Sequence, residues 1–305
     1  MSSRTALVTG AAGRLGRHVV PLLAAAGWSV TALMADADDA APVEGYVDRV
    51  VRGNAADPEV AAAACVGADA VAHLAAIPAP MNGPAHVVFG QNTLATFCVL
   101  DAAARGGVPV AVLASSIAAT GMSFSPNDVQ PPYLPLDELT PSQVADPYAL
   151  SKTTDESTAA MMTRRYGITT TAIRLPYLGT PIDRLPAHAE FLTARPDHGT
   201  RDGWAYLDTR DAARAIAAGL DRTGGDSLVI GVAAPDTLAP YRTEAMLDLL
   251  LPLVPRRTAF RGRRVPVDLS LAESVLGFFA EHLWPLPELE LPDLAEIRAR
   301  PARPV

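Results

Sequence analysis

The start of the chain constrains the fold more than any other segment. Residues 5–9 (TALVT) form an apolar run with the length of a buried strand, and glycines follow at positions 10, 13 and 16. Apolar residues then recur with helical spacing through residues 19–23, and residues 28–34 (WSVTALM) have the composition of a second strand. A strand, a glycine turn, a helix and a strand within about 30 residues make a β-α-β unit. This segment therefore predicts a parallel sheet covered by helices.

The three glycines have a steric role in such a unit. The chain turns sharply out of the first strand at Gly10, Gly13 and Gly16, and it brings backbone N–H groups to a helix N-terminus where a pyrophosphate can bind. A Cβ there would collide with the ligand or the sheet. The spacing is GxxGxxG rather than GxGxxG, and glycines also mark ordinary tight turns. The triplet therefore indicates a dinucleotide site mainly through its place in the β-α-β unit.

The alternation of strands and helices continues along the chain. Further strands are predicted at residues 70–74, 108–115 and 168–175, and further helices after Asp57-Pro58 and at residues 85–105 and 148–166. Residues 126–147, with six prolines, predict a long loop. We therefore expect an α/β fold with a doubly wound parallel sheet of the Rossmann type. Residues 1–175 would form the dinucleotide-binding domain, and residues 176–305 a smaller substrate-covering region with some elements returning to the core.

Composition argues against several classes of protein. A chain of 305 residues with 49% apolar residues can bury a core without disulfides or metals, and a net charge of −8 with no basic stripe argues against nucleic-acid binding. Cys65 and Cys98 lack CxxC spacing, which argues against a zinc site and fits a reducing compartment. The most apolar window, residues 19–35, is interrupted by Pro21 and Gly27. We expect a cytoplasmic protein with no signal peptide, no membrane contact and no metal.

Two pairs of polar residues include candidates for catalysis. Tyr148 and Lys152 are four residues apart in a predicted helix, so both side chains lie on one face. A tyrosine hydroxyl, with an ordinary pKa of about 10, is a poor acid or base at neutral pH, and a nearby ammonium stabilises the phenolate. Ser115 and Ser116 follow a strand, where open α/β sheets bind ligands. Each pattern alone also fits a solvated helix face or a strand end that satisfies its own backbone.

Taken together and in this order, these motifs resemble the extended short-chain dehydrogenase/reductase family, the NAD-dependent epimerase/dehydratase group. The resemblance covers most of the chain. It includes residues 8–16 (VTGAAGRLG), 53–57 (GNAAD), 69–76 (DAVAHLAA), 92–96 (NTLAT), 206–213 (YLDTRDAA) and 268–277 (DLSLAESVLG).

The resemblance implies an oxidoreductase that uses NAD or NADP and moves a hydride to or from a secondary alcohol or ketone of a sugar or sugar-like substrate. It implies that Tyr148 is the general acid/base, that Lys152 assists it and binds the nicotinamide ribose, and that Ser116 orients the reacting oxygen. The implied cofactor residues are Gly10, Gly13, Arg14, Leu15, Gly16, Asn54, Leu74, Ala75, Ala76, Tyr148 and Lys152. Tyr177 is assigned to the substrate pocket, and Asn92 to a structural role.

The acid that would bind the adenine ribose is displaced in this sequence. The family position for it falls on Met34, and Asp36 follows two residues later. A carboxylate there accepts hydrogen bonds from both ribose hydroxyls and repels a 2′-phosphate. We therefore expect NAD, while NADP stays possible because Arg14 could reach a phosphate.

Two departures from the family pattern limit which of the family's reactions we expect of this chain. Dehydratases carry an acidic pair just after the catalytic serine or threonine, whereas Ile117, Ala118 and Ala119 follow Ser116 here. Tyr177 replaces the asparagine that nucleotide-sugar enzymes usually have. A sugar epimerase with the same residues remains an alternative, and a non-catalytic dinucleotide-binding protein a weaker one. The family also implies a homodimer formed through the helix of residues 92–104 and the helix that carries Tyr148.

Two features of the last third remain ambiguous. Asp211 is expected to help start the helix that follows it. Five arginines form a basic cluster, which is either a solvated face or a site for an anionic group: Arg256, Arg257, Arg261, Arg263 and Arg264.

Overall fold

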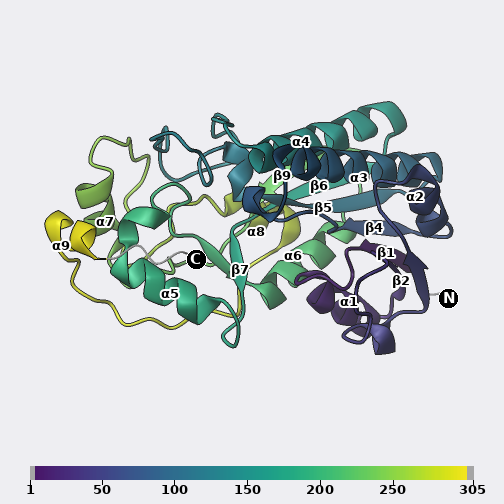
Figure 1. Cartoon of the computed structure of the whole chain (residues 1–305), viewed down its shortest axis with the longest axis horizontal. Helices are drawn as coiled ribbons and strands as arrows, with labels where there is room; N and C mark the ends of the chain where they lie inside the picture. The colour runs from purple at the N-terminus through teal and green to yellow at the C-terminus, as the bar shows by residue number, and fades with distance from the viewer. Residues whose placement is uncertain (1–3, 301–305) are drawn as a thin grey trace.

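A computed structural model describes residues 4–300; residues 1–3 and 301–305, the ends of the two predicted regions, lie outside the described residues. Seven parallel strands form one sheet in the order β3-β2-β1-β4-β5-β6-β9 (Figure 1). The strands are β1 (Thr5–Thr9), β2 (Ser29–Met34), β3 (Arg49–Arg52), β4 (Ala70–His73), β5 (Val110–Ser116), β6 (Thr169–Leu175) and β9 (Ser227–Gly231). This arrangement confirms the predicted Rossmann architecture.

Helices cover both faces of this sheet. One layer contains α2 (Pro58–Cys65), α3 (Ala85–Arg105) and α4 (Pro147–Tyr166), and the other contains α1 (Gly16–Ala25), α6 (Thr209–Leu220) and α8 (Ser270–Leu276) (Figure 1). Alternate side chains of β1 pack on opposite faces of the sheet. Ala6 and Val8 belong to the core under α1 and α6, and Leu7 belongs to the core under α2 and α3. Because both faces are buried, β1, β4 and β5 consist mostly of apolar residues, which is why they could be predicted from the sequence.

A third core lies at the opposite end of the molecule from the N-terminus (Figure 1). Its elements are β7 (Tyr177–Gly179), β8 (Tyr206–Asp208), α5 (Leu185–Ala194), α7 (Thr243–Leu250) and α9 (Leu294–Ala299). Short 3-10 helices complete the fold: η1 (Glu44–Tyr46), η2 (Pro80–Asn82), η3 (Ile117–Thr120) and η4 (Pro196–Gly199). Trp204 and Tyr206 are fully buried in this core. The domain boundary at residue 175 stays a prediction. After this residue, β9 still forms an edge of the main sheet and α6 packs against it.

Asp211 lies in the first turn of α6, where an acid favours the start of a helix, but it is not the residue that caps the helix. Asp208 caps α6 instead, by accepting a hydrogen bond from the backbone N–H of Arg210 at 2.9 Å. Asp211 is fully buried, and its Oδ2 accepts the backbone N–H groups of Glu281 and His282 at 2.9 and 2.7 Å. Its carboxylate therefore fastens the chain after α8 to α6, a contact between distant residues that no local pattern predicts.

The basic cluster is bound largely by acids of the same chain. Arg256 pairs with Glu244 and Asp248, Arg257 with Asp137, and Arg263 with Asp236, all at 2.6–2.8 Å. Three of the five arginines therefore hold the third core together, which favours a structural role over an anion site.

Candidate active site

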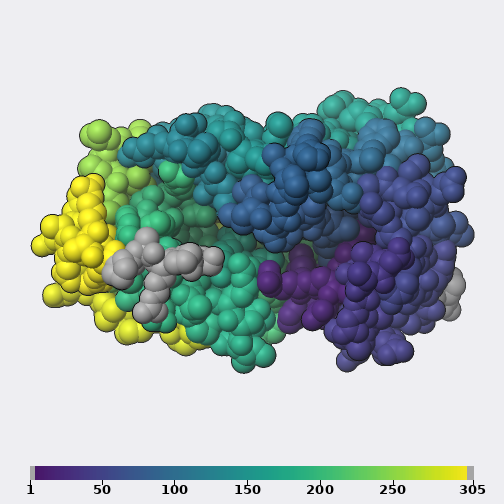
Figure 2. Space-filling view, viewed as in Figure 1, coloured from purple at the N-terminus to yellow at the C-terminus, as the bar shows by residue number. Residues whose placement is uncertain are grey.

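A cleft of about 480 Å³ opens at the carboxyl ends of β1, β2 and β4. The chain runs from β1 to β2 on one side and returns to β4 on the other, and this is the switch point where doubly wound sheets bind ligands. The volume lies within the range of small-molecule sites. The lining residues are Gly10, Gly13, Leu33–Asp36, Asp38, Gly53–Ala55, Leu74–Ile77, Gln91 and Ala95. Figure 2 shows this face hollowed between the purple N-terminal atoms and the blue atoms above them.

Two glycines of the turn are required by the backbone itself. Gly10 has a φ of +65°, and a Cβ there would stand 2.9 Å from the Cα and N of Ala75. A Cβ on Gly16 would stand 2.4 Å from the carbonyl oxygen of Ala11. Both distances are shorter than any carbon can accept, so the turn holds β1, β4 and α1 together only with glycine.

The twelve predicted cofactor residues divide into three groups, and the third, Tyr148 and Lys152, lies outside the lining of the cleft and is described below. Seven of them line the cleft: Gly10, Gly13, Asp36, Asn54, Leu74, Ala75 and Ala76. Three others lie in the turn without lining it. Arg14 is exposed, Leu15 is the buried residue before α1, and Gly16 begins that helix. The backbone N–H groups of Arg17 and His18 in the first turn of α1 donate to the carbonyl oxygens of Gly13 and Leu15, both at 3.0 Å, and the positive end of the helix dipole lies at the turn.

Thr9 fixes the floor of the cleft. Its Oγ1 accepts the backbone N–H groups of Leu74 and Ala75 at 3.1 and 3.2 Å, and it lies 2.8 Å from Nδ1 of His73. The other ring nitrogen of His73 lies 3.1 Å from Oγ1 of Thr96. Burial, together with the charge of Lys152, lowers the pKa of His73 to about 3, so the ring is neutral and acts as a fixed hydrogen-bonding spacer.

The loop after β2 carries two acids into the cleft. Met34 is buried, Asp36 is exposed, and the Oδ2 of Asp38 accepts the backbone N–H of Ala35 at 2.9 Å. Arg52, which the sequence did not single out, donates to the carbonyl oxygens of Ala35, Asp36 and Asp38 at 3.2–3.3 Å. It arrives there because β3 pairs with β2 in the register Met34–Arg52. Asp38 and Arg52 thus brace the loop, and the carboxylate of Asp36 remains at the cleft.

Asn54 is joined to a residue of α3. Its side-chain amide exchanges two hydrogen bonds with that of Gln91, and its Oδ1 also accepts the N–H of Ala56 at 2.9 Å. Gln91 lines the cleft and was missed, although it directly precedes the NTLAT motif. The pair closes the cleft on the side of α3.

Tyr148 and Lys152 lie together at the start of α4. Asp146 caps this helix by accepting the N–H of Ala149 at 2.8 Å. The Tyr148 side chain is buried, and Nζ of Lys152 lies 5.9 Å from the centroid of its ring. The ammonium also donates to the carbonyl oxygen of Ala114 at 3.0 Å. Burial alone would lower the pKa of Lys152, but the negative charge of Asp155 and the contact with Tyr148 outweigh it, so the pKa is raised and the amine is protonated.

Ser116 reaches the same place from β5. It ends that strand, and its Oγ accepts the N–H of Ala118 at 3.1 Å. Ala118 packs against Tyr148 in a small cluster that includes Ile77, and Ile77 also lines the cleft. Through the contacts of Ala118 and Ile77, Ser116 at the end of β5 and the Tyr148–Lys152 pair of α4 lie near one end of the cleft, although none of the three residues lines it.

Comparison with known proteins agrees with this geometry. Residues 6–195, more than half of the chain, match the NAD dependent epimerase/dehydratase family. The chain belongs to this family. It is an enzyme family of the extended short-chain dehydrogenase/reductase type, and the match confirms the resemblance that the sequence motifs indicated.

The chain is also similar to individual proteins of known sequence or structure. It is 30% identical over 169 residues to a uronate dehydrogenase of Pseudomonas syringae pv. tomato, which covers 55% of this chain and 58% of that protein. The chain thus spans less than two thirds of this relative. A UDP-glucose 4-epimerase structure from Thermotoga maritima superposes with a TM-score of 0.67 at 18% identity, covering 91% of this chain and 94% of the other. A UDP-glucose 4-epimerase from Brucella ovis in complex with NAD gives 0.67 at 20% identity and 98% coverage of both. The two structures show the shared fold.

The neighbouring serine, Ser115, has a structural role in this family member. Its Oγ donates to Oε1 of Glu156 at 2.6 Å, and Glu156 also receives Nε and Nη2 of Arg174, both at 2.9 Å. Asn92 is structural as well: it exchanges hydrogen bonds with the backbone of Ile77 and donates to Ser151. These networks tie α4 to the strand ends and engage the hydroxyl of Ser115 as a donor, whereas the hydroxyl of Ser116 accepts from Ala118.

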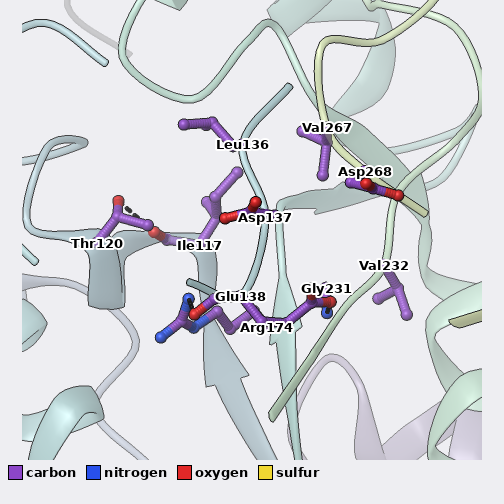
Figure 3. A pocket seen from close by; sticks show the side chains of 10 residues that line it. All are labelled: Ile117, Thr120, Leu136, Asp137, Glu138, Arg174, Gly231, Val232, Val267 and Asp268. Atoms are coloured by element: carbon purple, nitrogen blue, oxygen red, sulfur yellow. Dashed lines mark hydrogen bonds between the residues drawn. The ribbon is translucent and has the colours of Figure 1, made fainter. Parts of the chain in front are cut away.

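A separate small cavity, of about 20 Å³, is lined by Arg174, Glu138 and Gly231 among others (Figure 3). Figure 3 shows the side chain of Glu138 beside Arg174 and close to Gly231, whose N–H donates to Oε1 of Glu138 at 2.8 Å. Burial raises the pKa of Glu138. The space suits a single water molecule and is too small for a sugar.

Tyr177 stands on β7, in contact with the third core. Its ring stacks on His188 at 3.8 Å between centroids, and the guanidinium of Arg184 lies 4.3 Å from the same ring. Tyr177 does not line the cleft as defined above. Its place between the Rossmann core and the third core is compatible with a substrate-facing role, which stays a prediction.

Proposed function

We propose that this protein is an NAD-dependent oxidoreductase that moves a hydride to or from a secondary alcohol or ketone of a sugar or sugar acid. The observation that supports this most is the gathering of Ser116, Tyr148 and Lys152 near one end of the glycine-walled cleft. The similarity to a uronate dehydrogenase favours a sugar acid among the possible substrates.

The residues of the cleft fit a dinucleotide. The Gly10 turn leaves no room for a Cβ, the positive dipole end of α1 lies at this turn, and Asp36 supplies an acceptor for ribose hydroxyls. Bound NAD would supply a two-electron acceptor for the substrate. Lys152 has two of its hydrogen-bond donors engaged, by Ala114 and Asp155, and its third donor would serve a ribose hydroxyl.

The chain's own residues handle the proton. As the alcohol carbon loses its hydride, the hydroxyl proton passes to the oxygen of Tyr148, which must first be a phenolate. The ammonium of Lys152 stabilises that phenolate, and the hydroxyl of Ser116 donates to the substrate oxygen and holds it in place. In the reverse direction, Tyr148 returns the proton to the reduced carbonyl.

A substrate screen tests this function. The purified protein is mixed with NAD and with uronates, free sugars, nucleotide sugars and simple ketones, and the absorbance of reduced nicotinamide is followed. We expect a change with at least one sugar or sugar acid. Conversion of a nucleotide sugar without any net change would identify an epimerase instead. Cofactor binding with no turnover of any substrate would indicate a non-catalytic binding protein.

We expect Asp36→Ala to weaken NAD binding about tenfold, because the carboxylate accepts from two ribose hydroxyls. NADP binding should strengthen, since the substitution removes a carboxylate that repels the 2′-phosphate. Fluorescence titration of both reduced cofactors measures the effect. Asp39→Ala is the matched control, because Asp39 lies outside the cleft on the same loop and accepts only from Ala41. Equal losses in the two variants would contradict the role of Asp36.

The outer faces of α3 and α4 are proposed to form a homodimer interface. Val87, Leu94 and Phe97 on α3 are 39–51% exposed, and Leu150 on α4 is 45% exposed. α3 also has the length and hydropathy of a membrane span, with 44% of its apolar window buried. The inner residues of α3 pack on the sheet. A second copy of the chain, packed on the outer face of α3, would cover the apolar residues that are exposed there.

We expect Leu94→Arg to convert the dimer to a monomer at micromolar concentration, because a two-fold interface would bring the two introduced charges close together. Light scattering coupled to size exclusion measures the mass. Leu253→Arg is the control, because Leu253 is 88% exposed and lies away from both helices. A wild-type mass equal to one chain would refute the dimer.

A further inference from the structure

Asp155 lies directly beside Lys152 inside the protein. Its Oδ2 is 3.2 Å from Nζ of Lys152, and its side chain is 2% exposed. Its other oxygen, Oδ1, is buried and has no hydrogen-bond partner among the residues described. A carboxylate in such a place loses its hydration, so it is held mainly by the ammonium. The hydride transfer proposed above does not require this acid.

The surrounding elements supply few other charges. β4 contributes His73, which is neutral, and α4 contributes Tyr148 and Glu156. β6 contributes Arg174, which is paired with Glu156 in a bidentate ion pair. α3 offers the hydroxyl of Thr96, and the residues of β5, β9 and η3 include no titratable side chain. Asp155 is therefore the one acid within this described group that is free to neutralise Lys152.

We propose that Asp155 is a positioning residue that sets the working pH of the Tyr148–Lys152 pair. Its negative charge offsets the ammonium that would otherwise stabilise the phenolate. The pair therefore gives up its first proton at a higher pH than it would beside a neutral side chain. Because Nζ donates to both Ala114 and Asp155, the same contact fixes the direction of the third donor. This inference rests on the proposed function of Tyr148 and Lys152.

The sign of the effect does not depend on which group of the pair ionises. The carboxylate of Asp155 repels a phenolate on Tyr148, and it also favours the protonated form of the Lys152 amine. Its removal therefore eases the loss of the first proton from either group. Asp155→Asn should lower the midpoint of this step by about one pH unit.

Two measurements on the whole protein test the proposal. The first is an NMR titration of protein labelled with tyrosine carrying carbon-13 at Cζ, in which the Tyr148 signal is assigned by its loss in Tyr148→Phe. The second is the pH profile of kcat/KM for oxidation. For each protein, kcat/KM is divided by its own plateau value at high pH. At one pH unit below the wild-type midpoint, this fraction should be about fivefold larger for Asp155→Asn than for the wild type.

Two variants serve as references for charge. Asp155→Glu keeps the charge and should keep the wild-type midpoint within about 0.5 unit. Asp101→Asn removes an acid that pairs with Arg105 near the other end of α3, and it should move neither measurement. If Asp155→Asn does not fold, Asp155→Ser, which leaves room for a water molecule beside Lys152, replaces it in the same titration.

The outcomes separate this inference from the proposed function. An unchanged midpoint in a folded Asp155→Asn or Asp155→Ser protein refutes the inference, and Asp155 is then structural only. The NMR midpoint reports on the pair even if no substrate is turned over. Activity that survives Tyr148→Phe would instead refute the assigned function, whatever the behaviour of Asp155.

Discussion

Tyr148→Phe is expected to lower kcat by about three orders of magnitude and to leave the affinity for reduced cofactor within about threefold of the wild type. Phenylalanine keeps the buried ring, which packs on Ala118 and meets Phe124 edge to face with 5.8 Å between centroids. It removes only the hydroxyl, so the substrate proton has no acceptor. Steady-state turnover and cofactor titration measure the two quantities separately.

Tyr166→Phe is the matched control for this substitution. Tyr166 lies at the far end of the same helix, where its hydroxyl donates to Asp101 at 3.1 Å. We expect its turnover to stay within about twofold, as for a surface substitution away from the site. Full activity in Tyr148→Phe, or an equal loss in both variants, would show that the phenol does not carry the proton.

The sheet and its main helices were predictable because each carries a local signal. β1 and α3 have the bounds that the sequence predicted, and Asp57 caps α2 by accepting the N–H of Glu59 at 2.8 Å. Two edge strands were missed. β3 (RVVR) is mostly exposed and has arginines at both ends, so neither an apolar run nor a turn signal marks it. β9 lies at the opposite edge and is only partly buried.

The site was predictable as a set of residue types and not as a set of contacts. The glycine turn, Ser116, Tyr148 and Lys152 could be singled out by their order along the chain, which resembles the family's motifs, and their roles stay predictions. Residues that arrive from a neighbouring strand carry no such signal. Arg52 reaches the loop after β2 only through the register of β3, so no local pattern places it there.

Buried charges were the hardest feature to predict. Asp155 and Glu156 are adjacent in the sequence and look like a solvated acidic pair on a helix. The structure turns both inward, one to Lys152 and the other to Arg174, which lies 18 residues away on β6. Burial of this kind depends on which partner the sheet brings opposite each acid, and that follows from tertiary packing rather than from local composition.

The Glu156–Arg174 ion pair provides the other large expected effect. Arg174 is 13% exposed and Glu156 is 9% exposed at the side chain, and the carboxylate also accepts from Ser115. Removing the arginine alone leaves a nearly buried carboxylate without its counterion. We expect Arg174→Met to lower the free energy of unfolding by about 3–5 kcal/mol, as for other buried pairs broken on one side. Urea denaturation followed by circular dichroism measures this loss.

The same measurement on two further variants decides whether the unpaired charge is the cause. Adding Glu156→Gln to Arg174→Met removes that charge and keeps an acceptor for Ser115, so most of the lost stability should return. Arg105→Met breaks an ion pair of the same type whose arginine is 67% exposed, and it should cost less than about 1 kcal/mol. If Arg174→Met is no more destabilising than Arg105→Met, the pair is a surface-like contact, and α4 must be held against the strand ends by apolar packing alone.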